Sequence, residues 1–189
     1  LAALVARVLD LILGLAGVAA DLLLGVECLE LDDVGAGELK RVDLRLSEGQ
    51  SRAEVRAAHG WDPTLPTVLA VGSRRVHEFT AFLRAVNEAE LPVQWVVVTG
   101  DDDELLAEVR DIDWRGPAHL YGYVTELPLW LRAVDAVVTK AGGLTVAEAL
   151  AAGCPPFITQ CTPMHERGNA DYVVAHGAGE DRQQVLDPQ

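Results

Sequence analysis

The chain has 189 residues, half of them hydrophobic, so it can bury one substantial core, and we expect one domain with an appendage rather than two full domains. Its 15 basic and 29 acidic residues give a formal net charge of −14, and such a surface repels nucleic acid and anionic lipid unless basic residues cluster. The sequence has only two lysines, Lys40 and Lys140, and no basic cluster, which excludes nucleic-acid binding as a main role.

Residues 1–26 are almost wholly apolar. Their longest uncharged run, residues 11–20, is shorter than the roughly 20 residues that a helix needs to span a bilayer. We interpret residues 1–48 as an apolar helical segment and linker, either a buried helix or the remnant of an N-terminal acceptor domain. A membrane-associated hairpin or anchor is the alternative. Because the chain begins with Leu1 rather than Met, we expect a fragment or a processed product.

Residues 49–189 are predicted to form the globular domain, which opens with a helix at residues 51–59. Ser51 is a suitable N-cap, Glu54 stands at the capping-box position, and Gly60 ends the helix.

Short apolar runs then alternate with stretches of helical spacing. Strands are predicted at residues 67–72, 94–99, 119–124, 135–139 and 156–160. Helices are predicted at residues 77–89, 103–110, 127–133 and 166–175, with one more between the last two strands. Continuous Val- and Leu-rich strands separated by helices are typical of a parallel sheet covered on both faces, so we predict an α/β domain.

In such a sheet, ligands bind beyond the carboxyl ends of the strands, near the point where the strand order reverses. Five predicted loops follow strands and are expected to gather on one rim. They are residues 72–75, 100–104, 121–126, 139–145 and 160–169.

The loop at residues 139–145 leads into a helix through Gly142 and Gly143, and Thr145 is predicted to be the N-cap of that helix. Glycines let the backbone approach a ligand, and helix N-terminal N–H groups attract anions. One interpretation is therefore a diphosphate cradle, with Thr145 as a hydroxyl donor. The other is an ordinary turn and N-cap.

Two charged residues flank this turn. Lys140 either adds a positive charge to a phosphate or is a solvated lysine. Glu148 either completes a capping box with Thr145 or accepts hydrogen bonds from the two hydroxyls of a ribose.

The loop at residues 160–169 is richer in hydrogen-bonding side chains than a connector needs. His165, Glu166 and Asn169 are expected on one face at the start of a helix. They are either sugar ligands or a polar helix N-terminus with a surface histidine.

Two patterns raise the possibility of a metal. The acidic run at residues 101–104 resembles a carboxylate cluster for Mg²⁺ or Mn²⁺, but acids are also favoured in the first turn of a helix, which is our interpretation. Cys28, Cys154 and Cys161 lack C-x-x-C spacing, so we expect buried or free thiols in a reducing cytosol. We predict no metal site.

Two linked motifs carry a resemblance to a known family. Lys140 to Pro156 reads Lys-Ala-Gly-Gly-Leu-Thr-Val-Ala-Glu-Ala-Leu-Ala-Ala-Gly-Cys-Pro-Pro, and the stretch from His165 to Gly179 follows it. Both resemble the C-terminal domain of the monogalactosyldiacylglycerol synthase and processive diacylglycerol glucosyltransferase group, and more distantly the MurG-type N-acetylglucosaminyltransferases. The resemblance covers about residues 50–179.

The resemblance implies a UDP-sugar-dependent glycosyltransferase that moves a hexose to a lipid acceptor such as diacylglycerol. It implies the C-terminal, donor-binding half of a GT-B fold, a Rossmann-like parallel sheet with helices on both faces, and neither a cofactor nor a metal, because helix-end amides neutralise the leaving diphosphate. The implied nucleotide-sugar-binding residues are Gly72 and Ser73 after the first strand, Tyr123 and Val124 beside the uracil, Lys140 beside the turn, Gly142, Gly143 and Thr145 at the diphosphate, Glu148 at the ribose, and His165, Glu166 and Asn169 near the donor sugar and ribose.

The chain departs from the family pattern in three ways. The loop Gly72-Ser-Arg-Arg75 is shorter than the usual glycine run, so either Arg74 or Arg75 contacts phosphate or the loop is closed. His165 stands where the family often has glutamine, which leaves the donor sugar open. The N-terminal half, which in the family binds the acceptor and supplies the catalytic base, is expected to be missing, so we expect the isolated chain to be inactive.

Three functions remain open at this point. The first is the glycosyltransferase, whose lipid acceptor is bound by a missing or separate N-terminal domain with peripheral membrane contact. The second is a donor-binding subunit that is inactive without a separate acceptor-binding membrane partner, and the third is a fragment without a ligand. The first two imply UDP-sugar binding in the cytoplasm, at the cytoplasmic face of a membrane.

Overall fold

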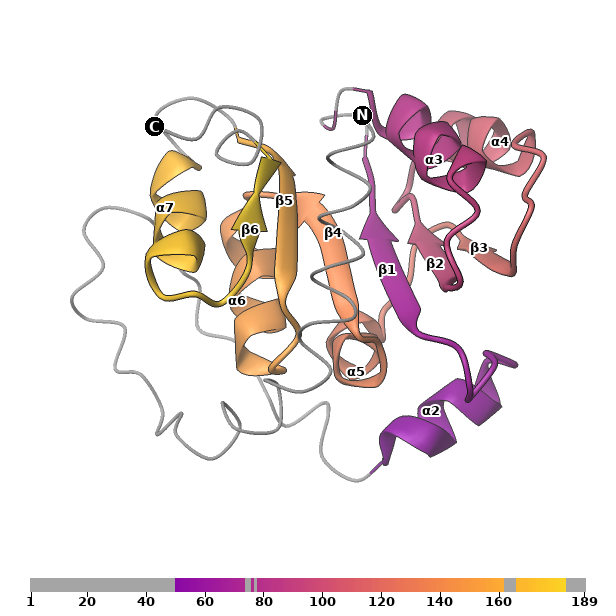
Figure 1. Ribbon diagram of the computed structural model, residues 1–189, viewed down its shortest axis with the longest axis horizontal. Coiled ribbons are helices and arrows are strands. Elements are labelled where there is room, and N and C mark those ends of the chain that lie inside the picture. The colour runs from indigo at the N-terminus through magenta and orange to yellow at the C-terminus, as the bar shows by residue number, and fades with distance from the viewer. Residues whose placement is uncertain (1–49, 74–75, 77, 162–165, 183–189) are drawn as a thin grey trace.

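The computed structural model describes residues 50–73, 76, 78–161 and 166–182, which form a parallel sheet flanked by helices (Figure 1). The apolar segment predicted at residues 1–48 lies outside the described residues, as do Arg74, Arg75 and His165. None of the helices in the described ranges is long and apolar enough to cross a membrane.

The sheet has six strands in the order β3-β2-β1-β4-β5-β6, and every neighbouring pair is parallel. The strands are β1 Thr67–Val71, β2 Gln94–Val98, β3 Ala118–Tyr121, β4 Ala136–Lys140, β5 Pro156–Gln160 and β6 Glu180–Asp181. All five predicted strands are present. The sixth was not predicted, because two acidic residues carry no apolar run. The predicted α/β architecture is confirmed.

Helices cover both faces of the sheet. They are α2 Arg52–Ala58, α3 Phe79–Glu88, α4 Asp103–Arg110, α5 Leu127–Ala133, α6 Gly143–Ala151 and α7 Arg167–Ala175. Because side chains of a strand alternate between faces, Val68 and Ala70 join the core under α3 and α4, whereas Leu69 joins the core under α2, α5 and α6. Helix α7 packs with α6 around Ile158.

Helix α2 begins with the predicted capping box: the Glu54 N–H donates to Ser51 Oγ at 3.3 Å, and the Ser51 N–H donates to Glu54 Oε2 at 2.7 Å. Gly60 ends the helix with a φ of +67°, which favours glycine. This part of the sequence-based prediction is confirmed.

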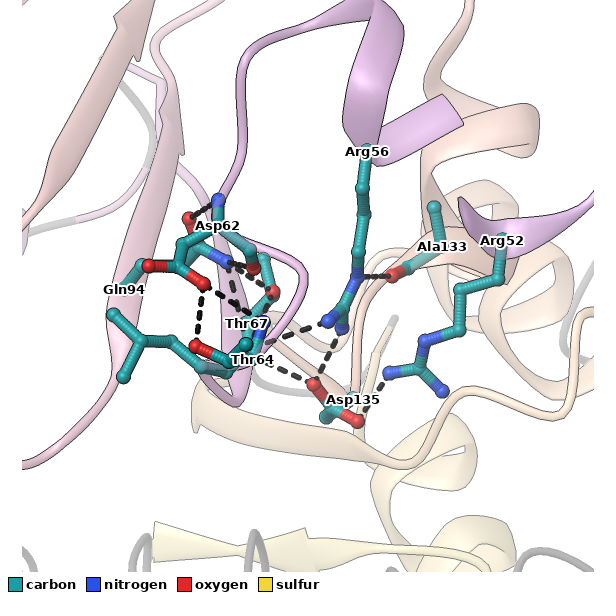
Figure 2. A network of polar contacts seen from close by, with 9 residues as sticks. Arg52, Arg56, Asp62, Thr64, Thr67, Gln94, Ala133 and Asp135 are labelled. Atoms are coloured by element: carbon teal, nitrogen blue, oxygen red, sulfur yellow. Dashed lines mark hydrogen bonds and ion pairs between the residues drawn. The ribbon is translucent and has the colours of Figure 1, made fainter. Parts of the chain in front are cut away.

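Asp135 attaches α2 to the amino-terminal end of the sheet, and Figure 2 shows Arg52 and Arg56 converging on it. Arg56 Nη2 lies 2.7 Å from Asp135 Oδ2, which also accepts the Thr67 N–H at 2.6 Å. Arg56 Nε donates to the Ala133 carbonyl at 2.8 Å. The cluster therefore fixes α2 and the starts of β1 and β4 at the end opposite to the loops predicted to bind ligand.

The strand order reverses between β1 and β4. These strands are neighbours in the sheet, with Val68 opposite Ala136 and Ala70 opposite Val138, although β2 and β3 lie between them in sequence. Their following connections leave in opposite directions across the sheet, and their carboxyl ends lie side by side at this point. Doubly wound sheets bind their ligands at this position.

Candidate nucleotide-sugar site at the carboxyl ends of β1 and β4

The turn after β4 joins Lys140 to a helix that starts at Gly143. Gly142 is the N-cap, and its carbonyl accepts the Val146 N–H at 3.0 Å. The prediction that Thr145 is the N-cap is therefore wrong, because the glycine pair enters the helix start and Thr145 lies in the first turn. Among the residues that the structure describes, no side chain caps α6, and the first N–H groups of the helix have no side-chain acceptor there.

Glu148 lies in the second turn of α6 and is half-buried. The capping box predicted between Thr145 and Glu148 is also wrong, since it requires Thr145 as N-cap. Burial raises the pKa of the Glu148 carboxyl, and within the described ranges this carboxyl has no hydrogen-bond or ion-pair partner. A half-buried carboxylate without donors gains from accepting the hydroxyl groups of a ligand.

Lys140, Glu166 and Asn169 come together beside this turn. Lys140 Nζ forms an ion pair with Glu166 Oε1, and the two side chains are 24% and 14% exposed. The buried Asn169 amide donates to the Ala141 carbonyl at 2.8 Å. Two side chains from the beginning of α7 are therefore attached to the β4–α6 turn.

Gly72 and Ser73 follow β1, the strand beside β4. The Gly72 N–H donates to the Val98 carbonyl at 2.8 Å, and a Cβ at Gly72 would lie 2.3 Å from the Phe79 ring. Glycine is thus required here for the close packing of α3 against the end of β1. Both residues lie at the carboxyl end of β1, beside the carboxyl end of β4.

Tyr123 and Val124 were expected at the end of the third strand, but β3 ends at Tyr121 and both lie in the loop before α5. Tyr123 is 74% exposed, and Val124 packs against the core that contains Trp130. Three strand spacings, about 14 Å, separate β3 from β4, so these residues share the rim but lie away from the glycine turn.

The acidic run at residues 101–104 belongs to the start of α4. Asp102 is the N-cap and accepts the Leu105 N–H at 3.1 Å, while Asp103 and Glu104 lie in the first turn. The helix-dipole interpretation is confirmed. Across the ranges that the structure describes, no group of three or more His, Cys, Asp or Glu side chains is placed to hold a metal ion.

The two described cysteines are free. Cys154 is buried, and Cys161 is half-buried. Burial, reinforced by the negative charge of Asp181, raises the pKa of the Cys161 thiol to about 11, so it is protonated at neutral pH.

Two contacts of the site have no signature in the sequence. The acceptor for Asn169 is the backbone carbonyl of Ala141, and a backbone group has no residue-type signature. The partner of Lys140 is 26 residues away, so only the opposite charges, and no local spacing, connected Lys140 to Glu166.

The fold and the site define a Rossmann-like, doubly wound domain with an uncapped helix N-terminus at the point where its strand order reverses. Residues 65–185 match the family model described as "Glycosyl transferases group 1", and the chain belongs to this family.

Curated relatives share its sequence over part of their length. The chain is 32% identical over 162 residues to the probable monogalactosyldiacylglycerol synthase 3, chloroplastic, of Oryza sativa subsp. japonica, covering 79% of this chain and 32% of that protein. It is 31% identical over 136 residues to the monogalactosyldiacylglycerol synthase 1, chloroplastic, of Arabidopsis thaliana, covering 68% of this chain and 26% of that protein. The chain thus spans about a third or less of these relatives.

Solved structures share its fold. Glycosyltransferase VinC in complex with DTDP is 21% identical with a TM-score of 0.54, over 70% of this chain and 32% of that one. Spinosyn rhamnosyltransferase SpnG, complexed with thymidine diphosphate, is 23% identical with a TM-score of 0.53, over 69% of this chain and 36% of that one. The family resemblance and the GT-B-type Rossmann-like fold inferred from the sequence are confirmed.

Proposed function

We propose that this chain is the donor-binding half of a UDP-sugar-dependent glycosyltransferase that transfers a hexose to a lipid acceptor such as diacylglycerol. The observation that carries the proposal is the half-buried Glu148 carboxyl one turn beyond the start of α6. Within the described part of the chain, this carboxyl has no partner and the helix start has no side-chain cap. The helix N–H groups can bind a diphosphate, and a carboxylate one turn further along can accept the two hydroxyls of a ribose. This combination matches a nucleoside diphosphate.

Each part of the donor is assigned to residues by their chemistry. The diphosphate lies against the first N–H groups of α6, at Gly143 and Thr145, and these fixed donors stabilise the charge that develops on the leaving UDP. Glu148 accepts the two ribose hydroxyls. Gly72 and Ser73 border the phosphates from the β1 side, and no metal ion is required.

The uracil and the sugar lie on opposite sides of the diphosphate. We assign the uracil to the loop that holds Tyr123 and Val124, and the hexose to Glu166 and Asn169 at the start of α7, together with His165. The relatives named as monogalactosyldiacylglycerol synthases support a hexose donor and a diacylglycerol acceptor.

The acceptor and the catalytic base belong to a further domain, and the lipid acceptor implies peripheral contact with a membrane, which we place at its cytoplasmic face. The same observations fit a donor-binding subunit that docks onto a separate acceptor-binding membrane protein. Transfer to diacylglycerol, assayed with and without an acceptor domain, distinguishes the chain's own activity from that of an assembly. We expect no turnover by this chain alone.

Calorimetric titration of the 189-residue chain with UDP tests the donor site. We expect saturable binding that Glu148→Gln weakens and that Glu88→Gln, an exposed acid on α3, leaves unchanged. Absence of binding at millimolar UDP contradicts the proposal.

A further inference from the structure

Lys140 is the only lysine among the residues that the structure describes, and its ammonium points to a carboxylate. Lys140 Nζ pairs with Glu166 Oε1, with both side chains largely buried, at 24% and 14% exposure. A Cβ at Gly142 would lie 3.3 Å from Lys140 Nζ and 3.5 Å from its Cε, so the lysine side chain folds back over the glycine turn. The absence of a side chain at Gly142 makes room for this conformation.

The Glu166 side chain contacts Lys140 and does not cap the helix that it begins. The residue occupies the N-cap position of α7. Its carboxylate is directed toward the end of β4, where Lys140 compensates its charge. A carboxylate this buried is costly without a cation, because desolvation opposes ionisation.

A second contact of α7, through Asn169, fixes the position of the Lys140–Glu166 pair. Asn169, one turn further along, donates to the Ala141 carbonyl at 2.8 Å, next to Lys140 in the chain. The start of α7 is therefore held at two points against the β4–α6 turn, and the Glu166 carboxylate has a defined position relative to the uncapped N–H groups of α6.

We infer that Lys140 is a positioning residue for the sugar of the donor, acting through Glu166, and not a ligand of the diphosphate. The inference rests on the proposed function and assigns a role within the same site. The ion pair with Lys140 holds the Glu166 carboxylate in one position. A carboxylate in a fixed rotamer accepts hexose hydroxyls with directional preference. The Lys140–Glu166 pair thereby contributes to the choice of sugar.

Affinities for UDP and for UDP-hexoses separate this role from phosphate binding. Three proteins are titrated with UDP, UDP-glucose and UDP-galactose: the 189-residue chain, Lys140→Met and Lys140→Arg. The measured quantity is the ratio of the UDP-hexose Kd to the UDP Kd. It is compared for the hexose that the wild type binds more tightly. We expect Lys140→Met to raise this ratio about tenfold, the effect of losing one hydrogen bond to a charged group, while the UDP Kd changes less than about twofold. Lys140→Arg restores most of the wild-type ratio.

The double variant Lys140→Met/Glu166→Gln tests the route of the effect. We expect the double variant to raise the ratio no more than either single variant, since both remove the same interaction. A parallel loss of UDP and UDP-hexose affinity in Lys140→Met identifies a phosphate ligand and overturns the inference. An unchanged ratio with a lowered Tm identifies a structural ion pair and also overturns it. If the wild type does not bind UDP, the proposed function fails and the inference fails with it.

Discussion

Glu148 is the side chain on which the donor-site assignment depends most. Burial raises the pKa of its carboxyl, so it takes up a proton at a higher pH than an exposed glutamate does. The ionised form accepts two ribose hydroxyls, and the protonated form loses part of that capacity. We therefore expect the affinity for UDP to fall as the pH is lowered from 7.5 toward the raised pKa of Glu148.

Calorimetry at a series of pH values measures this effect. The second ionisation of UDP also changes with pH, so the comparison is with Glu148→Gln, in which only the phosphate contribution remains. A pH dependence that is identical in the two proteins contradicts a role for the Glu148 carboxylate in binding.

Gly72 is expected to tolerate no larger residue. Its added Cβ would lie 2.3 Å from the Phe79 ring, so Gly72→Ala must displace α3 or the end of β1 and should lower the free energy of unfolding by about 1–3 kcal/mol. The matched control is Gly168→Ala in α7, where a Cβ meets nothing within 4 Å and helix propensity favours alanine by about 1 kcal/mol. Urea unfolding compares the two. Equal stability of both variants would contradict the packing role of Gly72.

Helix α2 is held by charges rather than by a large apolar face. The Arg56 side chain is 7% exposed, and burial lowers the pKa of its guanidinium in spite of the nearby Asp135. Asp135→Ala leaves this buried cation without its counter-ion and should destabilise the protein by about 3–5 kcal/mol. Arg115→Ala breaks an ion pair with Glu90 whose side chains are 52% and 66% exposed, and it should cost about 0–1 kcal/mol.

Urea denaturation, with far-UV circular dichroism as the signal, ranks the two variants. A cost for Asp135→Ala no larger than that for Arg115→Ala would show that α2 is held by its packing alone.

Strands and helices were predicted correctly where the hydrophobic period and the residue composition indicated the same type of element. The valine runs of β1, β2 and β4 are buried on both faces, which an uninterrupted apolar segment indicates. The prediction of element ends was wrong where two local sequence patterns indicated different boundaries. The capping-box pattern at Thr145 and Glu148 placed the start of α6 too late, because the helix begins at Gly143. The third strand was predicted to continue to Val124, whereas β3 ends at Tyr121. No sequence rule identified β6, which pairs with β5 through two acidic residues.

His119, in the edge strand β3, makes the stability of the molecule depend on pH. Burial, followed by the charge of His59, lowers the pKa of His119 from its ordinary 6.5. His59 in turn accepts the Trp130 N–H on Nε2 at 3.0 Å, stacks on Trp61, and lies 3.8 Å from Glu126. Burial therefore favours the neutral form of the His119 imidazole.

The sign of the pH effect follows from His119. Its folded pKa is lower than its unfolded pKa, so between the two values the unfolded chain binds more protons and stability rises with pH. The contribution is complete above about pH 6.5 and is lost as the pH falls through the folded pKa. We expect the free energy of unfolding to decrease between pH 7.5 and 5.5, and to decrease less in His119→Asn.

Urea unfolding across this window measures both slopes, above the range in which ordinary carboxylates titrate. A slope that is the same in wild type and His119→Asn would contradict the assignment.

The overall architecture was predictable, but the position of the site within it was only partly so. Alternating strands and helices indicated a parallel sheet, and ligand loops at the strand ends followed from that topology. The order of the strands within the sheet could be established only from the structure. Because β1 and β4 are adjacent, Gly72 and Gly142 follow neighbouring strands, whereas Tyr123 follows β3, three strand positions away from β4. The family resemblance supplied the residue roles that periodicity alone left open.

The most direct test of the account combines a change in the ligand with a change in Glu148. UDP and its 2′,3′-dideoxy analogue are titrated by calorimetry against wild type and Glu148→Ala. We expect Glu148→Ala to weaken UDP binding by about 1–3 kcal/mol, and to leave binding of the dideoxy analogue nearly unchanged, because that ligand lacks the hydroxyls that Glu148 accepts. An equal loss for both ligands, or no binding of UDP by the wild type at millimolar concentration, would contradict the placement of a nucleoside diphosphate at the start of α6.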